Sequence, residues 1–460
     1  MTVALLENPR RKTFKVGTLV YTKAGLAAVF AWFTGVQLSM MFAGSAGQWF
    51  PLFLREYDIS NKEIIILTST IGSIINMVFN PIISPISDRT RTKWGRRRPF
   101  MIFTVPVVAV IVGLMPFTPE ITKAFTSVGW VASLLNMFPV APLFLVLAVL
   151  IALQRFLDMF FGTTYYYYIP DTVPSSHIGR LYSVFRIMGM IHGPLFSWFL
   201  YPLILTHTKI LVVTGAVFYC VSVLLLCWRV KEGEYPPVEL KQEEKKPPWY
   251  EGVRRYVKEC YGHSYYWMIY IYYGATQWGG LVGSLSIFFY RDELGLSLST
   301  LGKFNAVMGV VTLPLGLFAN YIAGIWVDRW GALKTKIYMF FYFPVNIASL
   351  FLVMGLREIA LFSILMIIPG SLMGIANAKL LIDLYPRDRY GQFCSAGAIV
   401  VCVVAIIVGP LLGMFYDWLQ WYRFLGLWGL FLSFASFPIL LILYRRWKAY
   451  GGGTDQYSPP

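Results

Sequence analysis

Four ionisable residues lie inside long apolar segments of this 460-residue sequence: Arg155, Asp158, Arg186 and Lys379. An unpaired charge at the centre of a bilayer costs at least ~2.5 to 3.5 kcal/mol, so each side chain must be paired, hydrated or neutral. Arg155 and Asp158 are three residues apart on one helix face, and we expect them to form an ion pair. Lys379 and Asp383 are four residues apart and are expected to form a second salt bridge.

Two roles fit the pair of Arg155 and Asp158. In the first role it is a structural ion pair that holds spans together. In the second role Asp158 binds and releases a proton, because a carboxylate in a low-dielectric surrounding has a raised affinity for protons that a nearby arginine opposes. A solute that binds Arg155 would then change the protonation of Asp158.

Other side chains inside the apolar segments suit a ring that carries several hydroxyl groups. The guanidinium fork of Arg186 matches vicinal hydroxyls, although an arginine near a span end also reaches the headgroups by snorkelling. Aromatic rings flanked by amides can stack on such a ring, and they serve equally well as lining or interfacial residues. The candidates for these contacts are Trp32, Gln37, Tyr165 to Tyr168, Gln277 and Trp278.

The sequence lacks the patterns of a metal site or an enzyme. Its five cysteines include no CxxC pair, and its four histidines do not have metal-ligand spacing. We therefore expect inert thiols, no metal and no cofactor. His192 fits a proton relay, but a hydrogen-bonded interior histidine is the simpler interpretation. No glycine-rich phosphate loop or nucleophile elbow occurs, so we predict that the protein is not an enzyme.

The elements that must position these residues are membrane-spanning helices. The chain is 57% hydrophobic and 13% charged, against roughly 25% charged residues in soluble domains. Apolar residues gather into blocks of about 20, the length that a helix needs to cross a bilayer. We predict an all-α membrane protein with twelve spans, at 24–50, 64–87, 100–116, 142–168, 181–203, 208–228, 264–289, 299–326, 336–356, 359–382, 392–416 and 421–444.

The seventh span contains a cluster of glycines at Gly279, Gly280 and Gly283. Glycines weaken a helix, so we expect this span to bend there. Close packing against a neighbouring helix would explain the same glycines.

The net charge of +16 comes from 39 Lys and Arg against 23 Asp and Glu. Most of these basic residues fall in segments on one side of the predicted membrane. By the positive-inside rule this side is the cytoplasm, and both termini are expected there. The charge therefore reflects orientation in the lipid bilayer rather than nucleic-acid binding. We expect a multi-pass protein of the cell membrane, either inner or plasma membrane.

A polar stretch divides the spans into two groups of six. Residues 231–263 combine Pro-Pro pairs with a mixed-charge run, a composition that cannot bury enough apolar surface to fold alone. We interpret them as a cytoplasmic linker between an N-terminal six-helix bundle at 1–230 and a C-terminal bundle with a short polar tail at 264–460. Within the linker, residues 249–261 have the pattern of an interfacial amphipathic helix, and a calmodulin-like target is the alternative.

One pattern occurs once in each half of the sequence. The spacing D-x-x-P-x-x-x-x-G-x-x-x-S begins at Asp171 and again at Asp383. Two six-span halves related in parallel and joined by a cytoplasmic linker are the layout of major facilitator transporters, whose site lies between the halves near the bilayer midplane. The repeat therefore predicts two pseudo-symmetric bundles of this fold.

A second pattern repeats after the second and eighth spans. Asp88 and Arg89 precede Gly95, and Asp328 and Arg329 precede Gly331. Carboxylates and guanidinium groups at facing helix ends can form a latch that breaks when the cytoplasmic side opens. A solvated charge cluster that only sets topology is the alternative. The predicted cytoplasmic gate consists of Asp88, Arg89, Asp171, Asp328, Arg329 and Asp383.

The segment after the second span carries a specific family resemblance. Asn80-Pro81 and the sequence SDRTRTKWGRRRP at 87–99, with Ile169-Pro170-Asp171 and Arg186, resemble the glycoside-pentoside-hexuronide cation symporters and the related sucrose-proton symporters. The resemblance implies a major facilitator fold and a glycoside-like solute that moves with a cation. It also implies that Arg186 contacts sugar.

This sequence departs from the sodium-coupled members of that family in the second span. Those members have acidic residues where this chain has Asn76 and Asn80, so the anionic oxygens that would replace the hydration shell of sodium are missing. We therefore expect proton coupling rather than sodium coupling. Relatives also have a carboxylate in the fourth span, to which Asp158 corresponds after a shift of one helical turn.

We predict a secondary transporter for a sugar or glycoside-like solute, coupled to protons. A carrier for an amphiphile such as a lysolipid and an uncoupled facilitator of the same fold are the alternatives within this class. An integral membrane enzyme, a receptor and a channel are alternatives from other classes. The lack of catalytic motifs disfavours the enzyme, and the doubled six-span plan disfavours the receptor and the channel.

Overall fold

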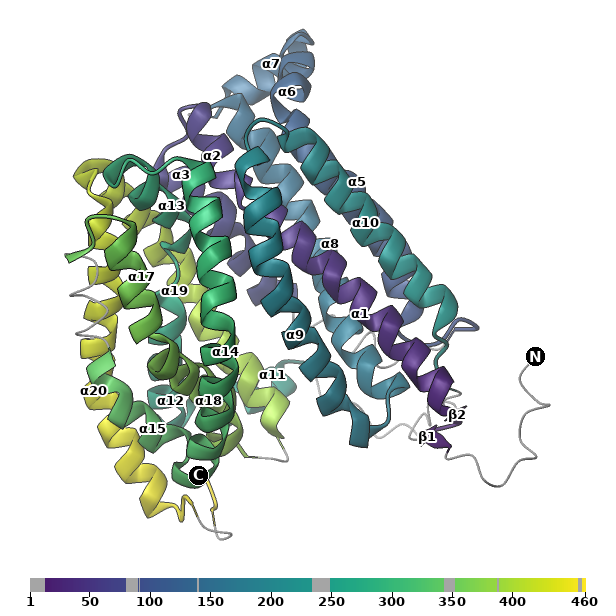
Figure 1. The fold of residues 1–460 in the computed structure, drawn as a ribbon, viewed down its shortest axis with the longest axis vertical. Helices are drawn as coiled ribbons and strands as arrows, with labels where there is room; N and C mark the ends of the chain where they lie inside the picture. The colour runs from purple at the N-terminus through teal and green to yellow at the C-terminus, as the bar shows by residue number, and fades with distance from the viewer. Residues whose placement is uncertain are drawn as a thin grey trace. The chain divides into compact units, whose positions relative to one another are not determined.

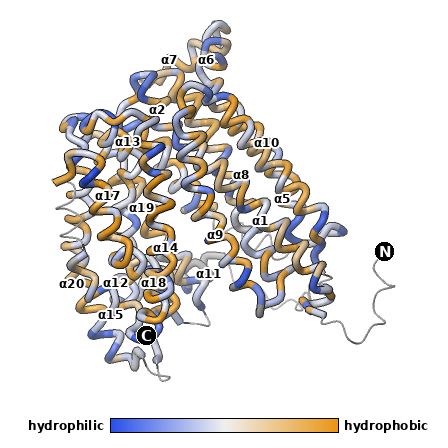
Figure 2. The backbone as a smooth tube through the Cα atoms, in the orientation of Figure 1, coloured by the Kyte–Doolittle hydropathy of each residue, from blue (hydrophilic) through white to orange (hydrophobic). Residues whose placement is uncertain are grey.

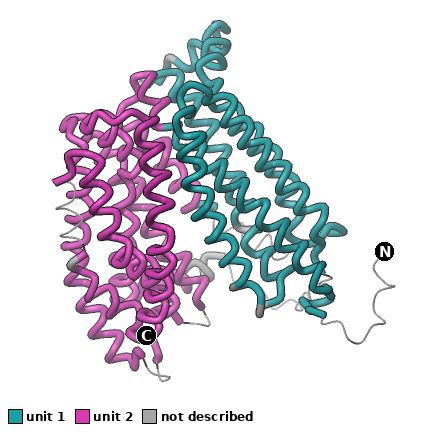
Figure 3. Tube along the Cα trace, viewed as in Figure 1, with its two compact units in different colours: residues 1–50, 78–240 teal, residues 51–77, 241–460 magenta. Residues whose placement is uncertain are grey.

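The computed structural model describes residues 13–79, 90, 92–138, 140–233, 249–342, 352–386, 389–453 and 457–460. The chain is mainly helical and divides into two compact units (Figure 3). Unit 1 comprises residues 1–50 and 78–240, and unit 2 comprises residues 51–77 and 241–460. Unit 2 therefore includes a segment, 51–77, from the first half of the sequence.

Unit 1 begins with an antiparallel hairpin of β1 (Phe14–Val16) and β2 (Leu19–Tyr21), an element outside the helical pattern of the sequence. The hydroxyl of Thr22 then caps the first helix by accepting a hydrogen bond from the Gly25 N–H at 3.1 Å. The helices of this unit (Figure 1) are α1 (Lys23–Ala46), α5 (Arg98–Leu114), α6 (Thr118–Thr126), α7 (Gly129–Asn136), α8 (Pro142–Thr172), α9 (Ser175–Phe199) and α10 (Thr208–Arg229). Short 3-10 turns occur at Met115–Phe117 and Tyr201–Leu203.

The helices of unit 1 pack around one apolar core. Helix α1 packs on α9 and α10, α10 packs on α5, and α5 packs on α8. Phe33 of α1 is fully buried in this core, as are Tyr165 and Tyr168 of α8. The hydroxyl of Tyr168 donates a hydrogen bond to the carbonyl of Val230, which ties α8 to the end of α10. These contacts fix the position of α8, the helix that carries Asp158.

Unit 2 includes helical segments from the first half of the chain, which are most of α2 (Trp49–Glu56), α3 (Asn61–Ile65) and a π-helical turn at Ile66–Thr70. Its further helices are α11 (Trp249–Tyr261), α12 (Ser264–Trp278), α13 (Ser286–Phe288), α14 (Leu298–Trp330), α15 (Ala332–Tyr338), α17 (Leu356–Leu365), α18 (Ile367–Leu384), α19 (Tyr390–Leu419) and α20 (Leu425–Ala449). Short 3-10 turns lie at Gly283–Leu285, Met339–Phe341 and Tyr422–Phe424, and a second π-helical turn lies at Phe289–Glu293.

The core of unit 2 is rich in buried aromatic rings. Helix α12 packs on α19 and α20, α14 packs on α18, and α15 packs on α18 and α20. Tyr266 and Tyr270 of α12 are buried with Phe393 of α19, and the ring centroids of Tyr266 and Phe393 are 4.1 Å apart. Gly331 ends α14 with a positive φ of 78°, a backbone conformation that favours glycine.

Nine helices within the described ranges are long and apolar enough to cross a membrane. Apolar residues dominate these helices along most of their length (Figure 2). Of the other predicted spans, α9 occupies the place of the fifth, and α12 ends at Trp278, where Gly279 and Gly280 follow. The predicted weakness of the seventh span at its glycines is thus confirmed. The predicted span 336–356 falls partly outside the described residues.

The sequence repeat has equivalent positions in the two units. Asp171 is the penultimate residue of α8, and Asp383 is the penultimate residue of α18. Pro174, two residues after the end of α8, is the N-cap of α9, and Pro386 likewise lies between α18 and α19. The repeated aspartate therefore stands at the same place on the corresponding helix of each unit.

Candidate functional site

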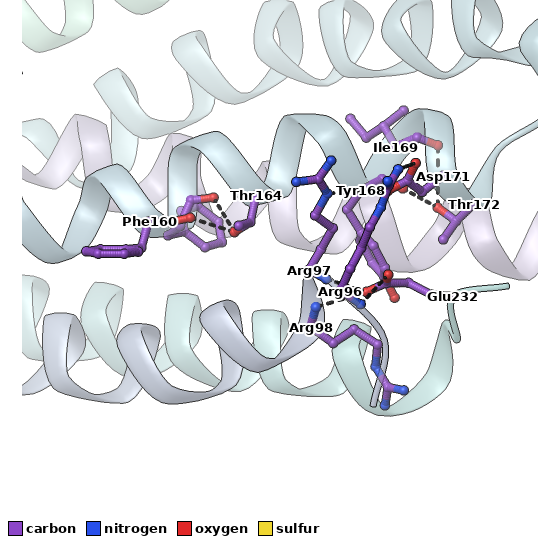
Figure 4. Close-up of polar contacts among 11 residues, drawn as sticks. Arg96, Arg97, Arg98, Phe160, Thr164, Tyr168, Ile169, Asp171, Thr172 and Glu232 are labelled. Carbon is purple, nitrogen blue, oxygen red and sulfur yellow. Dashed lines mark hydrogen bonds and ion pairs between the residues drawn. The ribbon is translucent and has the colours of Figure 1, made fainter. Parts of the chain in front are cut away.

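The end of α8 in unit 1 carries a dense ionic cluster (Figure 4). The Asp171 carboxylate accepts hydrogen bonds from Arg96 at 2.5 and 3.1 Å, and from Nε of Arg97 at 3.4 Å. Asp171 is largely shielded from solvent, as are both arginines. Such charge-assisted hydrogen bonds in a shielded place are stronger than exposed ion pairs. The cluster therefore joins α8 to the segment that precedes α5.

A second carboxylate completes this cluster from the segment that follows α10. Glu232 accepts hydrogen bonds from the backbone N–H groups of Arg96, Arg97 and Arg98, at 2.8 to 2.9 Å. These N–H groups form the beginning of α5, so the negative charge also interacts favourably with the helix dipole. Gly95 makes this approach possible because a Cβ atom at this position would lie 2.6 Å from Cδ of Glu232.

In unit 2 an ion pair lies near the end of α18, and here the helix carries the positive charge, whereas α8 of unit 1 carries the negative one. Nζ of Lys379 on α18 lies 2.9 Å from Oδ1 of Asp328 on α14. The expected Lys379–Asp383 salt bridge is therefore wrong: the lysine instead reaches across to the neighbouring helix. In unit 1 the ion pairs join α8 to the segment before α5, and in unit 2 the ion pair joins α18 to the end of α14.

Three predicted gate residues of unit 2 lie around one hollow. This hollow has a volume of about 1110 Å³, and its lining includes Asp328, Arg329 and Asp383. Lys379 lines it too. In unit 1, Asp171 lies in the cluster described above, whereas Asp88 and Arg89 are outside the described residues.

Asp158 has a different partner from the one that the sequence predicted. Its Oδ2 atom accepts a hydrogen bond from Nε2 of Gln154 at 2.6 Å. The expected ion pair with Arg155 is absent, and the side chain of Arg155 is exposed. The physical reason is helical geometry: a residue four positions away lies more nearly above Asp158 than one three positions away.

The remaining candidates of unit 1 lie on α1, α8 and α9. Trp32 and Gln37 of α1 are half-buried, and the Trp32 ring lies 5.8 Å from the guanidinium carbon of Arg229. Tyr165 of α8 is fully buried against Phe33 and Phe161, so its ring belongs to the core. Arg186 is exposed on α9.

The remaining candidates lie at the end of α12 in unit 2 and in the predicted second span. Gln277 is exposed. Trp278 is buried, its indole N–H donates to the carbonyl of Val401 at 3.0 Å, and its ring packs in the bundle. Asn76 is half-buried, and Asn80 lies outside the described residues.

His192 and the cysteines have structural surroundings. Nε2 of His192 lies 3.2 Å from the hydroxyl of Ser45, which fits the interior hydrogen-bonded histidine. Burial raises the pKa of the Cys260 thiol on α11, so this cysteine is protonated at neutral pH. Within the described ranges no three His, Cys, Asp or Glu side chains come close enough to hold a metal ion.

Comparison with known protein families decides the class of protein. The family described as MFS/sugar transport protein matches residues 64–383, more than half of the chain. The chain belongs to this family. It is therefore a major facilitator transporter for a small-molecule solute, built as a multi-pass membrane protein, and not an enzyme.

Solved structures of transporters share the fold of this MFS/sugar transport protein. A bacterial homologue of the human lysosomal transporter Spinster, inward-facing and unoccupied, has a TM-score of 0.62 and 12% identity over 96% of this chain and 100% of its own. A D-xylose-proton symporter has a TM-score of 0.59 and 15% identity, covering 91% and 97%. The nucleoside transporter NupG has a TM-score of 0.58 and 13% identity, covering 91% and 99%. At these identities the similarity shows the fold alone.

No curated protein matches the chain in a sequence search.

Sequence reasoning missed three residues that the structure places at polar centres of this transporter. Gln154 is the partner of Asp158, and its i, i+4 spacing is a signal visible in the sequence. Glu232 lies in the predicted linker, and its partners are 134 to 136 positions away. Lys336 lies at the edge of a predicted span, yet it is buried. No local pattern marks the last two.

Proposed function

We propose that the protein is a secondary active transporter that moves a sugar- or glycoside-like solute by alternating access, coupled to protons. Twelve spans, cytoplasmic termini and a place in the inner or plasma membrane belong to this proposal. The family description, which names sugar transport, supports the solute class. The resemblance of residues 87–99 to glycoside-pentoside-hexuronide cation symporters and sucrose-proton symporters supports it on separate grounds.

The surroundings of Asp158 carry the proposal of proton coupling. Its carboxylate has a neutral amide as its hydrogen-bond partner and forms no ion pair with any described residue. An ionised carboxylate in an apolar span is unfavourable without a cation in contact, and a proton can neutralise it. Arg155, one turn away, stabilises the ionised form when the proton leaves. Asp158 can therefore alternate between two charge states during a transport cycle.

The solute contacts in this proposal come from side chains that the bundles leave accessible. Arg155, Arg186 and Gln277 are exposed, and their donors suit the hydroxyl groups of a sugar ring. Trp32 and Gln37, which are half-buried on α1, complete the proposed solute contacts. We assign the buried rings Tyr165 and Trp278 to helix packing.

We propose protons rather than sodium as the coupling ion. Asn76 supplies a neutral amide where a sodium site of the resembling family has a carboxylate. Sodium prefers oxygen ligands that include anionic ones, and Asn76 offers only a carbonyl oxygen.

The charged helix ends form the proposed cytoplasmic gate. In unit 1, Asp171 is held by Arg96 and Arg97, and in unit 2, Asp328 is held by Lys379. Each ion pair fixes the end of a helix that must move when the cytoplasmic side opens. We propose that Asp88, Arg89, Arg329 and Asp383 belong to the same gate.

A panel of ligands tests the solute class. Purified protein is screened by thermal shift against sugars, glycosides and lysolipids, and each hit is tested for counterflow into proteoliposomes that contain the unlabelled compound. The proposal predicts stabilisation by a sugar or glycoside and accumulation of its labelled form. Stabilisation by lysolipids alone would instead identify an amphiphile carrier.

A further inference from the structure

A polar centre that the proposed function does not use lies inside unit 2. Lys336 on α15 is 1% exposed. Its ammonium group donates a hydrogen bond to Oδ1 of Asn377 on α18 and lies 5.4 Å from the centroid of the Tyr272 ring. Both partners are neutral. Buried charges are normally paired with an opposite charge, so this lysine provides a place where an anion would be stabilised.

No carboxylate of the described residues supplies that anion. Lys336 forms no ion pair with any residue in the described part of the chain. The cavity next to it has neither Asp nor Glu in its lining. The sequence at 343–351, outside the described residues, also contains no Asp or Glu.

The cavity beside Lys336 has the size of a small-molecule site. Its volume is about 570 Å³, within the range of about 300 to 1,000 Å³ that is usual for ligand pockets. Phe340 and Phe437, whose ring centroids are 3.7 Å apart, provide an aromatic wall. Gly426 and Gly429 of α20 line it as well, and a Cβ atom at Gly429 would meet open space. The cavity is therefore apolar at these walls and cationic at one end.

Several hydrogen-bond donors of the cavity lining remain available to a ligand. The hydroxyl of Thr276 donates to the carbonyl of Tyr273, and that of Ser433 donates to the carbonyl of Gly429. These hydroxyls can therefore only accept a further hydrogen bond. The donors that remain include two N–H bonds of Lys336, the amide group of Asn377 and the hydroxyls of Tyr272 and Tyr290, none of which has an acceptor among the described residues. A ligand group with two acceptor atoms and a negative charge matches them.

We infer that this cavity binds an organic acid, with its carboxylate on Lys336 and Asn377 and its apolar body against the aromatic wall. A carboxylate carries one negative charge, which one lysine neutralises. A phosphate monoester, at about −1.5 to −2, would leave excess negative charge in a buried place. The acid can come from the bilayer as a fatty acid or from water as an aromatic acid. The site lies in unit 2 and is separate from Asp158, so the inference extends beyond the proposed function.

Equilibrium binding to purified protein in nanodiscs tests this inference, with the signal of empty nanodiscs subtracted. Labelled decanoate represents the bilayer source, and labelled phenylacetate represents the aqueous source. Decanol and 2-phenylethanol serve as uncharged competitors. We expect saturable binding of at least one acid and displacement by its alcohol only at concentrations at least tenfold higher. Which acid binds identifies the source.

Two variants locate the site, and a third is the control. Lys336→Met removes the charge and is expected to weaken binding at least tenfold, whereas Lys336→Arg retains it. Gly429→Leu adds a side chain at a cavity-lining position and leaves Lys336 unchanged, so it is expected to abolish binding. It provides a second test if Lys336→Met does not fold. Lys334→Met, two residues away on α15, should bind as the unaltered protein does. Absence of saturable binding, equal affinity for acid and alcohol, or unchanged binding in Lys336→Met or Gly429→Leu would overturn the inference.

Discussion

The carboxylate of Asp158 shows how one side chain links the fold to its proposed chemistry. It lies on α8, whose position is fixed by the core around Phe33 and Tyr168, and it is held by Gln154 from one turn earlier. Because this partner is neutral, the charge of Asp158 can change without breaking a salt bridge. Proton coupling in our account depends on this property.

Replacing Asp158 by asparagine is expected to separate transport from proton movement. The amide keeps the size of the side chain but cannot bind or release a proton. We predict that Asp158→Asn reduces solute-driven proton movement in proteoliposomes to the level of empty liposomes, while counterflow exchange is retained in part. Asp158→Glu retains an acid at the site and serves as the control. Normal coupling in Asp158→Asn would show that the proton is carried elsewhere.

Gly95 is expected to be essential for the stability of unit 1. Its φ of 108° is unfavourable for residues with a side chain, and an added Cβ atom would lie 2.6 Å from the Glu232 carboxyl group. Gly95→Ala should therefore destabilise the protein by about 1 to 3 kcal/mol, seen as a lower melting temperature in detergent. Gly113→Ala, near the end of α5 with open space around it, is the matched control and should not lower the melting temperature.

For single residues, the sequence predicts where a side chain lies on its helix better than it predicts the residues that the side chain contacts. The repeat identifies Asp171 and Asp383 correctly as helix-end residues of the two units. The sequence does not predict that Glu232 caps α5, since the residues it caps lie more than a hundred positions away and no repeat marks it. Lys336 carries no signal of burial either, because it follows Arg329 and Lys334 in a stretch whose charges resemble those of a cytoplasmic loop.

At the level of elements, α19 and α3 show how glycine positions set helix contacts. Gly409 and Gly413 are four residues apart on α19, and α3 packs against them. A Cβ atom at Gly413 would lie 2.3 Å from Cα of Lys62. Small residues at this spacing allow the close approach of helix backbones in membranes. The Asp417 carboxylate also accepts hydrogen bonds from the backbone N–H groups of Asn61 and Lys62, at 2.7 and 3.1 Å.

Gly413→Ala is expected to force α3 away from α19. The methyl group would meet backbone atoms rather than a flexible side chain, so neither helix can relax locally. Overpacking of this kind costs about 1 to 3 kcal/mol, which a thermal unfolding measurement in detergent would detect. Gly374→Ala on α18, where an added Cβ atom meets open space, is the control. Equal melting temperatures for the two variants would contradict the contact.

The sequence predicts a helix well where a long apolar segment ends at helix-breaking residues such as glycine. The end of α12 at Trp278 follows from Gly279 and Gly280, and α11 covers the residues for which the sequence predicts a linker helix. The hairpin of β1 and β2 was not predicted, because its strands are only three residues each and carry no clear alternation. The grouping of residues 51–77 with the second half also has no local signal, since it arises from contacts with α19.

At the level of the whole molecule, the distribution of charge predicts the orientation. Both termini should face the cytoplasm, and the segment of α6 and α7 should face the opposite side. We predict that a membrane-impermeant maleimide added to intact cells labels Ser127→Cys but not Ser458→Cys, and that permeabilisation exposes the latter. Ser127 and Ser458 are both exposed in the structure, so the pair is matched for access. The reverse pattern would invert the assigned topology.

Proton movement driven by a solute gradient tests the central claim most directly. Proteoliposomes that enclose a pH-sensitive dye receive an inward gradient of the sugar or glycoside identified by thermal shift, with no initial pH difference. Our account predicts acidification of the lumen as the solute enters, and none with Asp158→Asn. Solute uptake at the same rate without any pH change would contradict proton coupling and identify a facilitator.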